Sequence, residues 1–314
     1  MIRLKNWFGK ANRKEMSWMS DLMETLRQEG ISPDLLRAVE EYRAAHALPE
    51  ALRPRIPASG FTYYGREVWE QALAALLCGE NLLLAGGKAT GKNVLAENLA
   101  AAFGRPAWDI SFHVNMDAAS LIGMDTFVDG AVTFRPGPVY RCAQCGGFGV
   151  LDEINMAKNE ALAVLHAVLD FRRAIDVPGY ERIPLAEETR FTRELNEALT
   201  SRFAVIQMPT IMEENLEKLL RAQFADLTDK YVHQFALLFL DLQKKCDSAE
   251  ISTKALDLRG MLDALRLMRR GVAAGPALDM GITNKAFDSY EQGLIRDVIA
   301  ARIPASLTAE KLFR

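Results

Sequence analysis

The sequence lacks long apolar runs and has few cysteines. No stretch approaches the roughly 18 consecutive apolar residues that a membrane-spanning helix needs, and the amino-terminus has no apolar core of the length found in secretion signals. Four cysteines among 314 residues are too few for a disulfide-based scaffold and fit a reducing compartment. We therefore expect a cytoplasmic protein with no membrane span.

The sequence also lacks an excess of either charge. Lys and Arg number 38 against 41 Asp and Glu, so the formal net charge is −3. This balance argues against a highly basic nucleic-acid coat protein and makes nucleic acid an unlikely partner. What is present is typical of a globular chain, with 49% hydrophobic and 25% charged residues, and the length predicts roughly two domains.

The pattern of apolar residues changes twice along the chain. Residues 1–60 have helical periodicity that is broken at Gly30 and by a cluster of three prolines. From residue 61 helix and strand patterns alternate, and after Pro209 only helical periodicity remains. We expect a helical extension over 1–60, an α/β domain over 61–210 and an all-helical domain over 211–314.

Short apolar runs alternate with helical patterns in the α/β domain. The runs lie at residues 81–85, 107–112, 148–151 and 203–208. Their length and continuous apolar character are typical of strands buried on both faces. The alternation predicts a parallel sheet with helices on both faces. The last domain has four amphipathic patterns, at residues 214–224, 229–245, 253–270 and 284–303.

A glycine- and lysine-rich segment links the first predicted strand to a helix, with the spacing of a phosphate-binding loop. Glycines let backbone N–H groups converge on phosphates, and Lys92 would reach the β- and γ-phosphates. Asn93 stands where a Mg²⁺-binding Ser or Thr is usual, and its amide oxygen can still bind that ion. The candidate nucleotide-binding residues are Gly86, Gly87, Lys88, Ala89, Thr90, Gly91, Lys92, Asn93 and Val94.

A second apolar strand ends in Asp152 and Glu153. A nucleotide hydrolase needs such carboxylates beside its phosphate loop: Asp152 would hold Mg²⁺ together with Asn93, and Glu153 would activate the attacking water. The alternative is a strand that runs into an acidic helix cap. The phosphate loop upstream favours the functional interpretation.

Four segments together resemble AAA+ ATPases, specifically the MoxR-like branch that includes cobaltochelatase-type subunits. They are the phosphate loop, Gly123 with residues 134–140 (FRPGPVY), residues 151–157 (LDEINMA) and residues 194–203 (ELNEALTSRF). The resemblance implies a P-loop AAA+ parallel sheet flanked by helices, followed by a small all-helical lid. It also implies ATP and Mg²⁺ as cofactors.

The resemblance further implies a homo-oligomer, most simply a hexameric ring. Arg202 matches the arginine finger that reaches a neighbouring subunit's nucleotide, although an arginine at a helix end is the alternative. The family places a basic residue at the start of a lid helix on the γ-phosphate; Lys254 and Arg259 are candidates, and we favour Arg259. The segment from about Met116 to Pro138 resembles an inserted hairpin that touches substrate or partner in the family, and a purely structural hairpin is the alternative. Asp129 and Gly130 form its turn signal.

The function implied is chaperone-like remodelling, activation or assembly of a partner, typically one with a von Willebrand factor A domain. Two alternatives remain open at this point. One is a nucleotide-binding assembly scaffold with weak ATPase activity, and the other is a defence or restriction motor that works with a nuclease.

One element of the AAA+ pattern is not evident. The family has another central strand before the arginine finger, and its polar tip positions the attacking water. Nothing after Leu185 is apolar enough for a strand buried on both faces. We therefore expect either that a short segment is missing between Phe191 and Thr192, or that the strand is truly deleted and the ATPase is slow.

Overall fold

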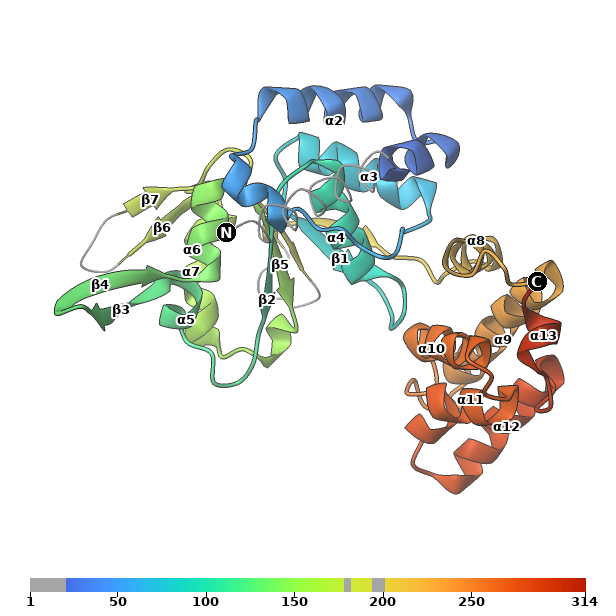
Figure 1. The fold of residues 1–314 in the computed structure, drawn as a ribbon. Helices are drawn as coiled ribbons and strands as arrows, with labels where there is room; N and C mark the ends of the chain where they lie inside the picture. The colour runs from blue at the N-terminus through green and yellow to red at the C-terminus, as the bar shows by residue number, and fades with distance from the viewer. Residues whose placement is uncertain (1–20, 178–181, 194–200) are drawn as a thin grey trace. The chain divides into compact units, whose positions relative to one another are not determined.

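The computed structural model describes residues 21–177, 182–193 and 201–314. The chain divides into two compact units. The sheet unit comprises Met1–Gly86 and Gly91–Met208, and the helical unit comprises Gly87–Thr90 and Pro209–Arg314. Figure 1 shows the ribbon of each unit and labels most of its helices and strands.

A five-stranded parallel sheet is the centre of the sheet unit. The strand order is β2-β5-β8-β1-β9. The bounds are β1 Leu82–Ala85, β2 Ala107–Ser111, β5 Phe148–Asp152, β8 Arg190–Arg193 and β9 Ala204–Gln207. The four strands expected from apolar runs are confirmed as β1, β2, β5 and β9. The predicted parallel sheet flanked by helices and followed by a helical region is also confirmed.

Alternate residues of β1 face opposite layers of the core, as the two-residue period of a strand requires. Leu82 and Leu84 belong to a cluster with α3 and α4, whereas Leu83 belongs to a second cluster with residues of α5, α6 and α7. These helices span α2 Pro33–Ala45, α3 Arg66–Leu77, α4 Lys92–Ala102, α5 Ala118–Ile122, α6 Pro138–Cys145 and α7 Asn159–Leu169. The helix over residues 21–28 and α2 also contribute to the first cluster.

Local sequence signals set the ends of the helices near the sheet. Pro138 occupies the first position of α6, where its missing N–H costs nothing, and Gly146 ends that helix at φ 63°. Asp117 caps α5 by accepting a hydrogen bond from the Ser120 amide. Both helices are therefore fixed by residues at their own ends.

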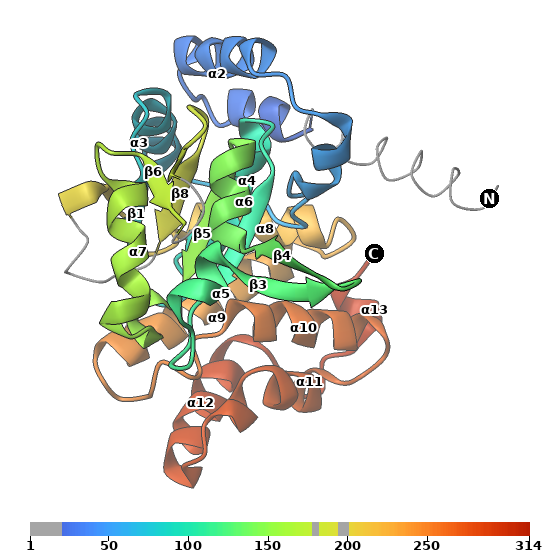
Figure 2. The same cartoon turned by 90° about the vertical axis from the view of Figure 1, so that its left-hand side faces the viewer.

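An antiparallel hairpin connects α5 to α6. It consists of β3 Gly123–Val128 and β4 Ala131–Pro136. Asp129 at φ 50° and Gly130 at φ 83° form its turn, as a two-residue hairpin with positive φ at both positions requires. The hairpin predicted from the sequence is thus confirmed, and it extends from the sheet unit beside α5 and α6 (Figure 2). A smaller hairpin joins β6 Ala174–Asp176 to β7 Arg182–Pro184.

The central strand β8 corrects a prediction. It lies between β5 and β1, although its residues form no apolar run. Phe191 and Thr192 pair with the consecutive residues Gly149 and Val150, so the strand continues through both. The predicted absence of this strand and the predicted break between Phe191 and Thr192 are both wrong. The polar tip expected after the strand lies outside the described residues.

The polar residues of β8 are compatible with burial because other segments supply partners for the strand. Arg190 is 6% exposed, and its guanidinium donates to the carbonyl oxygens of Leu76 at 3.3 Å and Thr189 at 2.9 Å. The Phe191 amide donates to Asn81 Oδ1 at 2.9 Å. Hydropathy alone could not reveal this strand, because two of its partners, Leu76 and Asn81, are distant in sequence.

The helical unit contains six α-helices among its described residues. They are α8 Glu213–Gln223, α9 Asp229–Asp247, α10 Leu258–Arg269, α11 Ala274–Gly281, α12 Ser289–Arg302 and α13 Ala309–Leu312. The helix expected from residue 253 begins only at Leu258, because Asp257 caps it by accepting from the Gly260 amide. Across the described part of the chain, no helix has the length and apolar character needed to cross a bilayer.

Candidate nucleotide-binding site

The loop after β1 enters α4 through a glycine with left-handed backbone. Gly91 has φ 86°, and a Cβ at this position would lie 3.0 Å from Cδ2 of Tyr63. Conformation and space both favour glycine here. Lys92 begins α4, and its Nζ donates to the Gly86 carbonyl oxygen at 2.9 Å. The sheet unit therefore places the lysine over the start of its own loop.

The structure brings Asn93 and Asp152 together. Asp152 ends β5, and Asn93 lies in the first turn of α4, 59 residues earlier. The Nδ2 atom of Asn93 is 3.4 Å from Oδ2 of Asp152. A carboxylate and an amide oxygen are suitable ligands for Mg²⁺. The two residues predicted to hold the metal are thus neighbours in the fold.

Glu153 lies immediately beyond the strand and is exposed. Its backbone has φ 53° and ψ 33°, the left-handed region that non-glycine residues adopt at a cost of roughly 1–2 kcal/mol. Such conformations concentrate at functional sites, where the surrounding structure maintains them. The conformation agrees with a functional position, but the catalytic role of Glu153 stays a prediction.

A small cavity of about 10 Å³ lies behind these side chains. Its polar lining consists of Lys92, Asn93, Asp152 and Thr192, and its apolar lining comes from β1, α4 and β5. Thr192 is 1% exposed, and its Oγ1 has no hydrogen-bond partner among the described residues. The volume is about that of one water molecule's probe sphere. Sequence reasoning missed Thr192, because the strand that carries it was not recognised.

The middle of the predicted loop, Gly87–Thr90, groups with the helical unit. Within that unit Lys88 Nζ donates to the Thr253 carbonyl oxygen at 2.9 Å. Thr90 Oγ1 donates to the Gly87 carbonyl oxygen at 3.0 Å, and Ala89 has φ 62°. Lys88 is thus engaged by the segment that precedes α10, a contact that no local sequence pattern predicts.

The other predicted nucleotide ligands remain predictions. Lys254 Nζ lies over the Phe287 ring at 4.7 Å from its centroid, and Arg259 is exposed in the first turn of α10. Val94 is partly buried and packs against the core of the sheet unit.

Arg202 lies just before β9, and its Nε is buried without a partner among the described residues. The pKa of the neighbouring Asp170 is lowered, mainly by a hydrogen bond from Arg172 and to a smaller extent by the charge of Arg202. Residues 194–200, the rest of the segment that resembles the arginine-finger region, lie outside the described residues.

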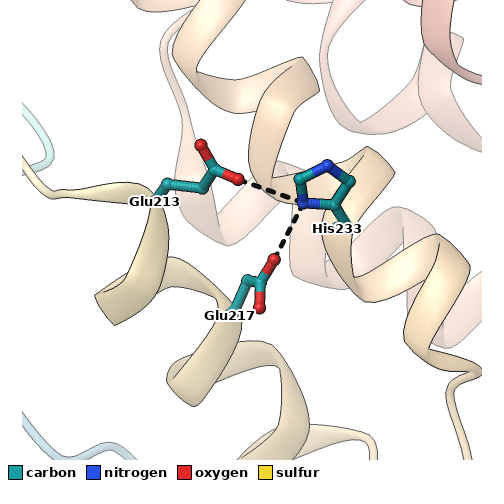
Figure 3. A group of neighbouring side chains, drawn as sticks. All are labelled: Glu213, Glu217 and His233. Carbon is teal, nitrogen blue, oxygen red and sulfur yellow. Dashed lines mark hydrogen bonds and ion pairs between the residues drawn. The ribbon is translucent and has the colours of Figure 1, made fainter.

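A second polar cluster occurs in the helical unit (Figure 3). Nδ1 of His233 on α9 is 3.0 Å from one oxygen each of Glu213 and Glu217 on α8. Burial raises the pKa of Glu217, but hydrogen bonds from His233 and Arg221 outweigh it, so the pKa is lowered overall. One imidazole and two carboxylates can ligate Zn²⁺. The same contacts also link α8 to α9 without a metal.

The chain is similar to a domain family and to several bacterial proteins. Residues 81–226 match the AAA domain family of the dynein-related subfamily. The chain is 31% identical over 303 residues to the uncharacterized protein YojN of Bacillus subtilis (strain 168), covering 91% of this chain and 98% of that protein. It is 32% identical over 248 residues to the uncharacterized protein SH1500 of Staphylococcus haemolyticus, covering 74% and 94%.

A solved structure with a related arrangement is that of a RuvB mutant from Thermotoga maritima. The TM-score is 0.45 at 14% identity, and the match covers 79% of this chain and 72% of that chain.

Proposed function

Because the chain belongs to the same family as YojN and carries an AAA domain of the dynein-related subfamily, we propose that it hydrolyses ATP with Mg²⁺ in a ring and thereby remodels a partner protein. The observation that carries this proposal is the meeting of the loop–helix junction with a strand-end carboxylate. Lys92 and Asn93 begin α4, and Asn93 Nδ2 lies 3.4 Å from Asp152 Oδ2.

The chain's own groups divide the chemistry between them. Lys92 would exchange its bond to the Gly86 carbonyl for the β- and γ-phosphate oxygens. Asn93 and Asp152 would hold Mg²⁺, which neutralises charge on the transferring phosphoryl group when bound. The exposed Glu153 carboxylate would accept a proton from the attacking water.

The ring and the partner are the finer parts of the proposal. Arg202 would reach the nucleotide of the adjacent subunit, where its planar guanidinium stabilises developing charge. A hexamer and a partner with a von Willebrand factor A domain rest on the resemblance to the MoxR-like branch. A test is to purify tagged Glu153→Gln: the proposal expects a partner carrying that domain to be retained with ATP and released with ADP.

Hydrolysis is tested by steady-state ATPase rates of the full chain. Glu153→Gln should bind ATP normally yet turn over roughly 100-fold more slowly, because general-base catalysis is lost. Lys92→Ala should lose nucleotide binding itself. The matched control is Glu160→Gln, an exposed glutamate at the start of α7. If wild type and Glu153→Gln turn over equally slowly, the hydrolysis proposal fails.

The shared site is tested by mixing two inactive variants. Glu153→Gln retains the arginine, and Arg202→Ala retains the carboxylate, so an equal mixture should regain about a quarter of wild-type activity at mixed interfaces. No recovery above the sum of the two separate rates would contradict a site shared through Arg202.

A nucleotide-binding scaffold with little turnover is a second candidate, favoured by Asn93 at the usual Ser or Thr position. Asn93→Thr distinguishes the two. If the protein is a motor whose site is adapted to the Asn93 amide, Asn93→Thr should lower its ATPase rate. If it is a scaffold whose ATPase rate is low because of that amide, Asn93→Thr should raise the rate. Mg²⁺ titration of the rate identifies the metal as the cause.

A further inference from the structure

A pocket of about 320 Å³ lies at the base of the β3–β4 hairpin, within the sheet unit. The first half of α5, the two ends of the hairpin, the start of α6 and Trp108 of β2 contribute to its wall. Three of its lining residues are arginines: Arg55, Arg135 and Arg141. Its lining includes no acidic residue.

The three arginines supply positive charge to the pocket, and Arg55 also acts on the nearby carboxylate of Asp109. All three are exposed, and none forms an ion pair with a described residue. Arg55 is held in place by a hydrogen bond to the Ala107 carbonyl oxygen at 3.2 Å and lies 4.9 Å over the Trp108 ring. Guanidinium groups arranged in this way suit carboxylate or phosphate oxygens.

Two further features of the wall favour an anion. Trp108 is 5% exposed, and its Nε1 donor is buried with no partner among the described residues, so it would reach an acceptor in the pocket only after the wall rearranges. The α6 helix begins at Pro138 in the lining and places its partially positive end there. A helix start and three arginines thus line one pocket, whose wall also includes Trp108.

Two glycines make this wall possible. Gly123 has φ 140°, and a Cβ there would lie 2.5 Å from Cζ of Phe134. A Cβ at Gly137 would collide with the Leu121 carbonyl oxygen. Both glycines belong to the segments with which this chain resembles its family, yet the candidate nucleotide site uses neither. The pocket gives them a structural purpose.

We propose that this pocket binds carboxylate side chains of an acidic peptide segment in the partner protein. Met124, Pro136 and Pro138 add apolar lining that suits a peptide, and the adjacent hairpin exposes Phe127 and Val132 by 76% and 66%. Nucleic acid fits less well, because single strands need open aromatic faces for stacking and the pocket's aromatic ring is buried beneath an arginine. The proposal rests on the proposed function only in taking the partner to be a protein.

The experiment measures fluorescence anisotropy of a labelled peptide that contains Glu and Phe residues, with the full chain at fixed salt. A matched peptide has Gln in place of Glu. The acidic peptide should bind, and the double variant Arg135→Gln, Arg141→Gln should weaken it about tenfold or more, since two charge-assisted hydrogen bonds are lost. The Gln peptide should bind weakly to both proteins.

Arg37→Gln is the matched control, since Arg37 is an exposed arginine of the sheet unit that pairs with Asp34 on α2. Its affinity for the acidic peptide should equal that of wild type. Equal weakening by Arg37→Gln, or equal binding of the Gln peptide, overturns the proposal. ATP binding of every variant is measured in parallel, so failure of the nucleotide site is distinguished from failure of the pocket.

Inorganic phosphate and a single-stranded oligonucleotide are the competing probes. If inorganic phosphate displaces the peptide at a concentration comparable to that of the peptide, the pocket is a site for a free anion and the proposal is overturned. Oligonucleotide binding that depends on Arg135 and Arg141 would reassign it to nucleic acid. A Gly137→Ala variant that folds with unchanged ATP binding but loses the acidic peptide would support the proposed wall.

Discussion

Two neighbouring strands at the centre of the sheet, β1 and β8, are both buried but are stabilised by different interactions. Every residue of β1 is buried and apolar, in the sequence Leu-Leu-Leu-Ala. β8 reads Arg-Phe-Thr-Arg, and its Arg190 and Thr192 are buried nearly as completely as leucines. The first strand is stabilised by transfer of apolar surface from water, whereas the second forms hydrogen bonds with the distant Leu76 and Asn81 and with the adjacent Thr189.

The difference shows which kind of strand a sequence reveals. An apolar run is visible because burial of each residue is favourable in any sheet. A polar strand such as β8 is stabilised by acceptors for its buried donors. Some of these acceptors, such as the Leu76 carbonyl oxygen, reach the strand only after the chain has folded. Substitutions that remove either the apolar contacts of β1 or the hydrogen bonds of β8 test this difference between the two strands.

The largest effect is expected for Leu84→Ala in β1. Leu84 is 2% exposed, so truncation should cost about 3 kcal/mol through lost transfer energy and a residual cavity. Urea unfolding monitored by circular dichroism measures this change. The control is Leu77→Ala, which truncates a partly buried leucine on α3. A loss no larger than that of the control would contradict the apolar support assigned to β1.

A smaller loss is expected for Arg190→Leu in β8. The leucine keeps apolar volume but removes the donors to the carbonyl oxygens of Leu76 and Thr189, which should cost about 2 kcal/mol. Arg190→Lys should recover only part, because an ammonium cannot reproduce the planar fork. If Arg190→Leu is as stable as wild type in urea unfolding, the polar support of β8 is disproved.

A partly exposed polar pair in the helical unit should matter less than the buried arginine. Asp257 caps α10 and pairs with Lys285. Burial raises the pKa of Asp257, but the bonds from Lys285 and the Gly260 amide outweigh it, so the folded-state pKa is lowered. Asp257→Asn keeps the cap and removes the charge, and at pH 7 it should cost about 0.5 kcal/mol after allowance for solvent screening.

The sign of the pH dependence follows from that lowered pKa. The stabilisation from Asp257 is fully present above the unfolded value of about 4 and is lost as pH falls through the lower folded value. The difference between wild type and Asp257→Asn should therefore shrink below about pH 4. Unfolding midpoints measured from neutral pH down to strongly acidic pH follow this change, and a constant difference would contradict the charge contribution.

The smallest effect on stability is expected for Thr192→Val. Its Oγ1 has no partner among the described residues, so an apolar group of the same shape should change the free energy of unfolding by less than about 0.5 kcal/mol. Thr192→Ser is the control that keeps the hydroxyl. A loss as large as that of Arg190→Leu would mean that the small cavity beside Asp152 holds a tightly bound water.

The candidate site was predictable in parts. The loop from Gly86 to Asn93 and the carboxylates after β5 carry local spacing that physical chemistry ties to phosphate and Mg²⁺. Thr192 was not predictable, because its strand has no apolar run. The engagement of Lys88 by the Thr253 carbonyl was not predictable either, since 165 residues separate the two and no local pattern marks a backbone acceptor.

By itself, the sequence determined the features that depend on residues a few positions apart. These include the apolar burial of β1, the glycine conformations at Gly91 and Gly130, the hairpin and the helix caps, because each follows from local sterics or from transfer of apolar surface. Only the tertiary structure decided that β8 lies at the centre of the sheet, that Asn93 meets Asp152, and that three arginines gather at the base of the hairpin. Those features depend on residues that folding brings together, and the local sequence around a polar group does not indicate which distant residue it will contact.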